Sequence, residues 1–271
     1  MLPTGYGGTS MQLTLDGRAA LITGGSKGLG LAMAKAFAEA GGHVAIVARG
    51  QAALDEAAAS IRAAAPAAKV AAIAADVASA EGCAAAFTEA ERALGQVDIL
   101  VNNAGTSQRG PFLEVSDALW QSDLDLKLFA AIRLARLAWP GMQARRWGRI
   151  INVLNVGAKA PPAEGAPTAV SRAAGMALTK VQANEGAKHN ILVNAMLVGI
   201  IESDQWVRRH AADQRNITWE EWKEEMGRPV PVGRLGKPEE FAGLALYLCS
   251  QVGGYVTGTA INVDGGRSPV V

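Results

Sequence analysis

The sequence predicts an α/β fold in which a doubly wound parallel sheet has helices on both faces, within a single domain. Short apolar segments alternate with longer, alanine-rich amphipathic segments along nearly the whole chain, and this alternation is typical of parallel strands joined by helices. The short segments are apolar almost throughout, which indicates strands covered on both faces. The third observation is a glycine-rich turn at residues 24–30, between the first strand and the first helix.

Seven segments have the length and composition of strands: residues 19–23, 43–48, 70–74, 97–101, 149–154, 191–197 and 260–263. Apolar periodicity predicts helices between them, near residues 28–40, 52–64, 81–94, 117–142, 168–187 and 239–249. A sheet of this kind binds its ligands outside the carboxyl ends of its strands.

Residues 15–271 are predicted to form this one domain, and residues 1–14 a flexible N-terminal tail without the features of a signal peptide. The alternation stops at about residues 200–232. There, residues 203–209 and a capping signal at 218–221 predict two short helices, which we interpret as a substrate lid. The lid tryptophans either line a substrate pocket or simply pack against the domain; they are Trp206, Trp219 and Trp222.

Composition excludes several classes of function. The chain has 26 Lys and Arg against 25 Asp and Glu and no basic block, so neither nucleic acid nor a membrane surface is an expected partner. No apolar run reaches the roughly 18 residues of a membrane span. Cys83 and Cys249 lie in apolar helical patterns without metal-site or disulfide spacing, so we expect buried, inert thiols. These observations predict a cytoplasmic protein without a metal site.

The glycine-rich turn is predicted to hold a dinucleotide. Gly24, Gly28 and Gly30 join the first strand to the first helix, and glycine permits positive φ and close backbone approach. The helix N-terminus offers unpaired N–H groups and its dipole to a pyrophosphate. This strand–turn–helix context is that of a Rossmann-like fold, and it places Ser26 and Leu29 beside the cofactor as well.

The charges near the turn favour NADP(H) over NAD(H). A site selective for NAD has an acid near position 48, where the ribose is bound. This chain has Ala48 followed by Arg49, with Lys27 inside the turn. Two cations and no acid favour a 2′-phosphate. The alternative is that Lys27 and Arg49 are solvated surface charges.

The pattern Gly24-x-Ser26-x-Gly28 also matches the nucleophile elbow of α/β-hydrolases. His189 or His210 could then supply the base. This alternative leaves the cationic ribose site unexplained, so we interpret Ser26 as a turn residue near the cofactor.

Residues 98–105, Asp-Ile-Leu-Val-Asn-Asn-Ala-Gly, together with the turn, resemble the short-chain dehydrogenase/reductase family, in its 3-oxoacyl carrier-protein reductase-like branch. Residues 148–153, 193–195 and 258–266 resemble later strands of the family. The resemblance implies a small-molecule substrate and a homodimer or homotetramer. It also implies that the following residues contact or border the cofactor: Asp76, Val77, Asn103, Ala104, Gly105, Arg172, Gly199 and Ile201. For residues 102–105 we favour a structural role, in which buried amides satisfy loop backbone.

The resemblance further implies an Asn-Ser-Tyr-Lys catalytic set, and none of the four residues is present. The serine position falls on Asn155, the tyrosine and lysine positions fall on Thr168 and Arg172, and the asparagine position falls on Lys127. The chain's tyrosines lie elsewhere and cannot take the role; they are Tyr6, Tyr247 and Tyr255.

Thr168 cannot simply replace a tyrosine as an acid. A phenol titrates near pKa 10 and an aliphatic hydroxyl nearer water's roughly 15.7, a gap of about 7 kcal/mol. Arg172 stays protonated, so it can bind ribose hydroxyls or an anion but cannot act as a base. Lys127 is the remaining titratable candidate, and the charge of Arg172 plus partial burial would lower its pKa. The alternative is an outward-facing lysine on a long helix.

Three functions stay open at this point. The first is an NADP(H)-dependent oxidoreductase that acts on a carbonyl compound or secondary alcohol through an atypical site of Lys127, Asn155, Thr168 and Arg172. The second is an NADP(H)-binding pseudoenzyme or sensor. The third is a non-redox lyase or decarboxylase that uses Lys127 as a base or as a Schiff-base amine. The cations Lys127 and Arg172 predict a substrate with a carboxylate or phosphate.

Overall fold

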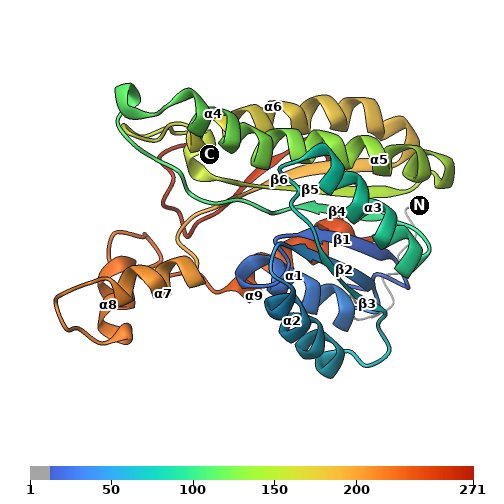
Figure 1. Cartoon of the computed structure of the whole chain (residues 1–271), viewed down its shortest axis with the longest axis horizontal. Helices are drawn as coiled ribbons and strands as arrows, with labels where there is room; N and C mark the ends of the chain where they lie inside the picture. The colour runs from blue at the N-terminus through green and yellow to red at the C-terminus, as the bar shows by residue number, and fades with distance from the viewer. Residues whose placement is uncertain (1–12) are drawn as a thin grey trace, which may run out of the picture.

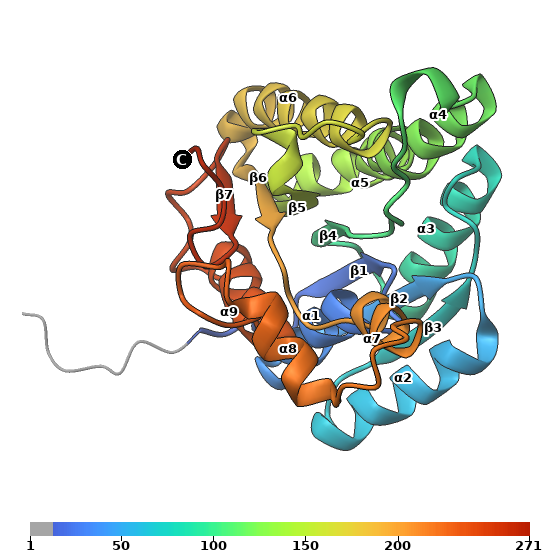
Figure 2. The ribbon, with the colours of Figure 1, turned by 90° about the vertical axis from the view of Figure 1, so that its left-hand side faces the viewer.

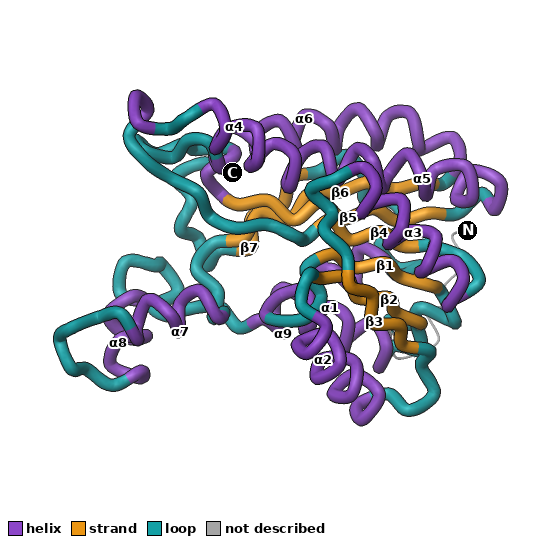
Figure 3. Tube along the Cα trace, viewed as in Figure 1, coloured by secondary structure: helices purple, strands orange, loops and turns teal. Residues whose placement is uncertain are grey.

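The computed structural model describes residues 13–271, apart from the side chains of residues 204 and 205. A seven-stranded parallel sheet in the order β3-β2-β1-β4-β5-β6-β7 lies between two layers of helices (Figures 1 and 3). The strands are β1 (Ala19–Thr23), β2 (His43–Ala48), β3 (Val70–Ala74), β4 (Ile99–Asn102), β5 (Gly148–Asn155), β6 (Ile191–Val198) and β7 (Ala260–Val263). The predicted doubly wound fold is confirmed. The strand order reverses between β1 and β4, which is where such sheets bind ligands.

One face of the sheet is covered by α1, α2 and α9, and the other by α3, α5 and α6 (Figure 1). The helices are α1 (Gly28–Glu39), α2 (Gln51–Ala64), α3 (Ala80–Leu94), α4 (Asp117–Leu124), α5 (Ala130–Arg145), α6 (Thr168–Gly186), α7 (Asp204–Ala211), α8 (Trp219–Gly227) and α9 (Pro238–Cys249), with a π-helical turn η2 (Asp125–Phe129) and short 3₁₀ turns η1 (Phe112–Glu114), η3 (Val156–Ala158) and η4 (Ala187–His189). Every residue of β1 is buried, because a parallel strand between helical layers meets apolar side chains on both sides.

The helix predicted near residues 117–142 is confirmed as continuous helical backbone, but it contains a π-helical turn that the sequence did not predict. The segment forms α4, then the π-helical turn η2, then α5. A π turn contains an extra residue, and such turns are frequent at functional sites. Here the turn contains Lys127, whose side chain is fully buried. The strand predicted at residues 97–101 begins two residues later, at Ile99. Asp98 precedes this strand, and its side chain accepts a hydrogen bond from the Ala19 N–H (3.1 Å).

The two short helices predicted after β6 are confirmed as α7 and α8, which project from the body of the domain (Figures 1 and 2). The capping box at Thr218 and Glu221 is present. Trp206 and Trp219 both pack against the buried Trp222, with ring centroids 5.9 and 5.5 Å from it. Trp219 and Trp222 therefore pack within this segment, whereas Trp206 also lines the cavity at the ends of the strands. The predicted tail lies outside the described residues as far as residue 12.

Cys83 and Cys249 are buried, as predicted, and burial raises their thiol pKa values to about 11 and about 12. Both thiols are therefore protonated at neutral pH, which fits inert packing groups. Within residues 13–271, no helix combines the length and the apolar character that crossing a membrane requires.

Candidate active site

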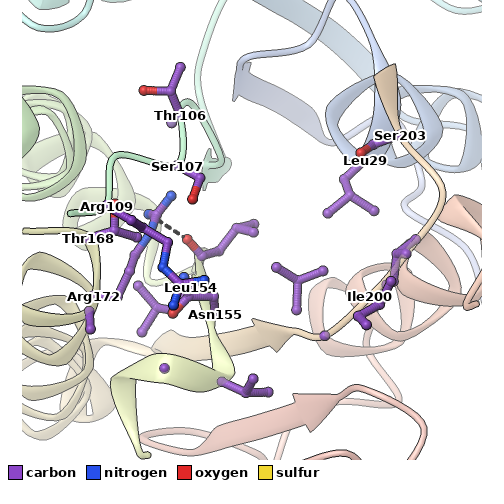
Figure 4. A pocket seen from close by; sticks show the side chains of 18 of the residues that line it. Leu29, Thr106, Ser107, Arg109, Leu154, Asn155, Thr168, Arg172, Ile200 and Ser203 are labelled. Carbon is purple, nitrogen blue, oxygen red and sulfur yellow. Dashed lines mark hydrogen bonds between the residues drawn. The ribbon is translucent and has the colours of Figure 1, made fainter. Parts of the chain in front are cut away.

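A cavity of about 870 Å³ opens at the carboxyl ends of the central strands. Its wall is formed by the segments that follow β1, β4, β5 and β6, together with the start of α6, parts of α7 and α8, and the C-terminal loop. Figure 4 shows Thr168, Arg172 and Asn155 on one side of this cavity, with Leu29 and Ile200 on the other. This is the position at which a doubly wound sheet is expected to bind its ligand.

Most of the predicted site residues line this cavity: Gly24, Lys27, Gly28, Leu29, Asn103, Ala104, Gly105, Asn155, Thr168, Arg172, Gly199 and Ile201. The remaining ones lie outside its wall: Ser26, Gly30, Arg49, Asp76, Val77 and Lys127. Arg49 and Asp76 are exposed just beyond β2 and β3. The sequence therefore brings the turn and the start of α6 to one cavity, whereas Lys127 lies behind its wall.

The glycine-rich turn has the geometry of a dinucleotide cradle. Gly24 and Gly28 have φ values of +64° and +53°, a backbone conformation that other residues rarely adopt. A Cβ at Gly30 would collide with the Gly24 carbonyl oxygen, whereas a Cβ at Gly28 would meet only the Ser203 Cβ, at 3.9 Å. The side chain of Lys27, which precedes α1, does not cap the helix, and a helix N-terminus with its backbone N–H groups is a favourable site for a pyrophosphate.

The amides after β4 hold the turn in place. Asn103 Nδ2 donates to the carbonyl oxygens of Thr23 (2.9 Å) and Gly24 (3.1 Å). Asn102 Nδ2 donates to Asn152 Oδ1 (2.8 Å) in the next strand. The expected role of satisfying loop backbone is therefore confirmed for Asn103, whereas Asn102 contacts a side chain of β5 instead.

Lys127 belongs to a buried polar cluster. Its Nζ donates to Thr168 Oγ1 (2.7 Å) and forms an ion pair with Asp123 Oδ1, and the side chains of Lys127 and Asp123 are both fully buried. The other oxygen of Asp123 accepts a hydrogen bond from Ser171 Oγ (2.6 Å). The outward-facing alternative for Lys127 is therefore wrong, and its charge is compensated by a carboxylate.

Thr168 connects this cluster to the cavity. Its hydroxyl accepts hydrogen bonds from Lys127 Nζ and from the Gln108 N–H (3.0 Å), and it donates to the Gln108 carbonyl oxygen (2.7 Å). Thr168 lines the cavity and Lys127 does not. The hydroxyl is therefore the one contact of the lysine that a ligand in the cavity can reach among the described residues.

The pKa of Lys127 is lowered to about 8, mainly by burial and to a smaller extent by the nearby charge of Arg172, while the hydrogen bond to Asp123 and the charge of that carboxylate oppose both effects. The predicted direction is confirmed, with burial as the larger cause. Burial also lowers the pKa of Arg172, to about 10, although Asp123 favours its charged form. Near neutral pH Arg172 stays charged and Lys127 titrates just above that range.

Arg172 lies in the cavity wall between β4 and β5. Its Nη1 donates to the Val153 carbonyl oxygen (2.8 Å), a bond that Figure 4 marks with a dashed line. A Cβ at Gly105 would collide with Arg172 Nη2, so a side chain there would displace the guanidinium from this position. On the same wall, Asn155 Oδ1 is buried without a hydrogen-bond partner, which leaves an acceptor for a ligand.

Asp123 and Ser171 were not among the predicted site residues. Each is separated by about one helical turn from a residue that was predicted. Asp123 is four residues before Lys127, and Ser171 is three residues after Thr168. That spacing was the only signal in the sequence, and it is common on solvent-exposed helix faces.

Comparison with known proteins identifies the family. Residues 24–268 match the family model described as Enoyl-(Acyl carrier protein) reductase. The chain is 33% identical over 260 residues to the 3-oxoacyl-[acyl-carrier-protein] reductase of Aquifex aeolicus, covering 94% of this chain and 99% of that protein. It is 32% identical over 250 residues to the acetoacetyl-CoA reductase of Shinella zoogloeoides, covering 92% and 98%.

Two solved structures are similar over nearly their whole length. L-Sorbose reductase from Gluconobacter frateurii, complexed with NADPH and L-sorbose, is 36% identical with a TM-score of 0.92, covering 96% of this chain and 100% of that one. A short-chain oxidoreductase from Pseudomonas aeruginosa PAO1 with an atypical catalytic center, in its NADPH-bound form, is 37% identical with a TM-score of 0.87, covering 94% and 98%. The chain therefore belongs to the short-chain dehydrogenase/reductase family of oxidoreductases, in its 3-oxoacyl-[acyl-carrier-protein] reductase-like branch.

Proposed function

We propose that this protein is an NADP(H)-dependent oxidoreductase that interconverts a carbonyl compound and its secondary alcohol through an atypical active site. The observation behind the proposal is that Lys127 contacts Thr168, and Thr168 and Arg172 line the cavity that begins at the glycine-rich turn. The related P. aeruginosa oxidoreductase binds NADPH and contains an atypical catalytic center, which supports this combination.

The residues at the turn fit a phosphorylated dinucleotide. Residues 24–30 and the N-terminus of α1 would hold the pyrophosphate. Lys27 and Arg49 would bind the 2′-phosphate, and Asp76 and Val77 would border the adenine. When bound, the nicotinamide supplies the hydride, and the protein supplies orientation and electrostatics.

The proton is proposed to come from Lys127 through Thr168. The Thr168 hydroxyl donates its hydrogen bond to the Gln108 carbonyl oxygen. In reduction, it would turn to the substrate oxygen and give up its proton there, while Thr168 Oγ1 takes a proton from Lys127 Nζ. One proton and one hydride are thus added to the C=O group. The threonine never becomes a free alkoxide, so the gap of about 7 kcal/mol between a phenol and an aliphatic hydroxyl does not have to be met. Arg172 would stabilise the negative charge that develops on the oxygen.

The lyase alternative fits the geometry poorly. A Schiff base requires the amine to meet a substrate carbonyl carbon, and the Lys127 side chain is fully buried, ion-paired and outside the cavity wall. A turnover assay distinguishes the proposed oxidoreductase from the pseudoenzyme alternative. Ketones and aldehydes, carboxylate-bearing ones included, should cause loss of the reduced-nicotinamide absorbance, whereas tight NADPH binding without any turnover would contradict the proposal.

The rate of carbonyl reduction is expected to fall as the pH rises through about 8, which is the lowered pKa of Lys127. Only protonated Lys127 can release a proton, and that form is lost above this pH. Alcohol oxidation needs the neutral amine, so its rate should rise over the same range. Steady-state kinetics in both directions measures the two profiles. Profiles that move in the same direction would contradict the role of Lys127.

The variant Arg49→Ala is expected to raise the Kd of NADPH by about 10- to 100-fold and to leave that of NADH unchanged, because a charge-assisted hydrogen bond to the 2′-phosphate is lost. Fluorescence titration measures both constants. Lys69→Ala is the matched control, since it removes one exposed positive charge at the amino end of β3. Equal weakening of both cofactors, or the same loss in Lys69→Ala, would contradict the prediction.

A further inference from the structure

The charged side chains that line the cavity are positive. Six cationic side chains line it: Lys27, Arg109, Arg172, Arg208, Arg209 and Arg267. Among the described residues that line it, none is Asp or Glu. A cleft with charges of one sign raises the local concentration of oppositely charged ligands. The cavity therefore fits ligands with several negative charges.

Part of this charge lies on the side of the cofactor phosphates. Lys27 is in the glycine-rich turn. Arg208 and Arg209 follow Ser203, whose Cβ is the nearest atom to a Cβ built at Gly28. Arg109 is on the opposite side of the cavity, where Figure 4 shows it near Thr168. Arg109 is thus on the side of Thr168 and Arg172, at the proposed reacting end, and not on the phosphate side.

The backbone fixes Arg109 close to Thr168. The preceding residue, Gln108, exchanges two backbone hydrogen bonds with Thr168 Oγ1, and Arg109 pairs with Pro167 in an isolated bridge. The guanidinium is exposed and, within the described part of the chain, no carboxylate forms an ion pair with it. Asn155, whose Oδ1 is a buried acceptor without a partner, lies on the same wall.

We infer that Arg109 binds an anionic group of the substrate, and that the substrate is a small carbonyl compound whose carboxylate or phosphate lies close to the reacting C=O. This inference rests on the proposed function, because it places the C=O at Thr168. A guanidinium presents paired N–H donors that match a carboxylate or a phosphate. The anion and the C=O are close in the substrate because Arg109 and Thr168 are adjacent in the protein.

The test compares two pairs of ketones with NADPH as the reductant. Pyruvate is paired with methyl pyruvate, and dihydroxyacetone phosphate with dihydroxyacetone, so that the pairs separate a carboxylate from a phosphate. Each pair is measured with the unaltered protein, with Arg109→Gln, and with Arg136→Gln as a matched control, since Arg136 is exposed in α5 away from the cavity wall.

The expected result is that one anion is preferred over its neutral partner, and that Arg109→Gln raises the KM for that anion by about 10- to 100-fold. The KM of the neutral ketone, the kcat and the Kd of NADPH should stay unchanged. Three results would overturn the inference: equal KM values for both members of each pair, a loss of NADPH affinity in Arg109→Gln, or the same rise in KM in Arg136→Gln.

If no ketone is reduced, the proposed function fails, and the anion site is then judged by binding alone. Equilibrium dialysis of pyruvate and dihydroxyacetone phosphate against the NADPH-loaded protein measures it. Binding of either probe that Arg109→Gln weakens supports the site, whereas undetectable binding of both, or binding that the substitution leaves unchanged, overturns it.

Discussion

Replacing Lys127 by methionine is expected to lower the kcat for carbonyl reduction by about 100- to 10,000-fold, the range that a positioned proton donor typically contributes. Methionine retains the unbranched apolar stem but cannot supply a proton to Thr168 Oγ1. The Kd of NADPH should stay unchanged, because Lys127 does not line the cavity. Single-turnover reduction at a fixed pH below 8, combined with a cofactor titration, measures the two quantities separately.

Two comparisons distinguish lost chemistry from lost folding in Lys127→Met. Lys188→Met is the matched control, since this exposed lysine lies just before β6, at the opposite end of the strand from the cavity. Thr168→Val removes the hydroxyl with little change in shape and should be as slow as Lys127→Met, whereas Thr168→Ser retains the hydroxyl and should keep most of the activity. A Thr168→Val enzyme with unaltered kcat would contradict transfer through this group.

The strands could be predicted closely because their signal is local. Residues 43–48 and 70–74 are short apolar segments, and the structure has the same bounds for β2 and β3. The π turn inside the helix over residues 117–142 could not be predicted, because a single extra residue does not disturb apolar periodicity that is averaged over many turns. The turn nevertheless decides which residues face inward, as the buried Lys127 shows.

Site residues could be predicted where the backbone conformation accepts only one residue type. The glycines of the turn are required by positive φ and close approach, so their role followed from the sequence. Asp123 could not be found in this way, because an acid four residues before a lysine usually marks a weak exposed pair. Only the fold shows that the pair is buried and that Ser171 completes it. The charge of Lys127 cannot contact an anionic substrate directly, because Lys127 lies outside the cavity wall, whereas Arg109 lines the cavity.

The variant Asp123→Asn is expected to lower the free energy of unfolding by about 3–5 kcal/mol, because it leaves a buried ammonium without its counter-charge. It should also lower the pKa of Lys127 below its value of about 8, since burial and the charge of Arg172 would then act without the opposing carboxylate. The pH at which carbonyl reduction declines should therefore move to lower pH. Denaturant unfolding measures the first effect and the pH profile of kcat the second.

Asp125→Asn is the matched control, because Asp125 is two residues along the same segment and its ion pair with Arg133 (3.3 Å) is about a quarter exposed, with 27% of each side chain accessible. A pair of that kind contributes at most about 1 kcal/mol, and its loss should leave the pH profile unchanged. A purely structural role for Asp123 predicts lower stability with the same pH midpoint. An unmoved midpoint in Asp123→Asn would therefore mean that the carboxylate does not set the charge of Lys127, because only an electrostatic role couples the two measurements.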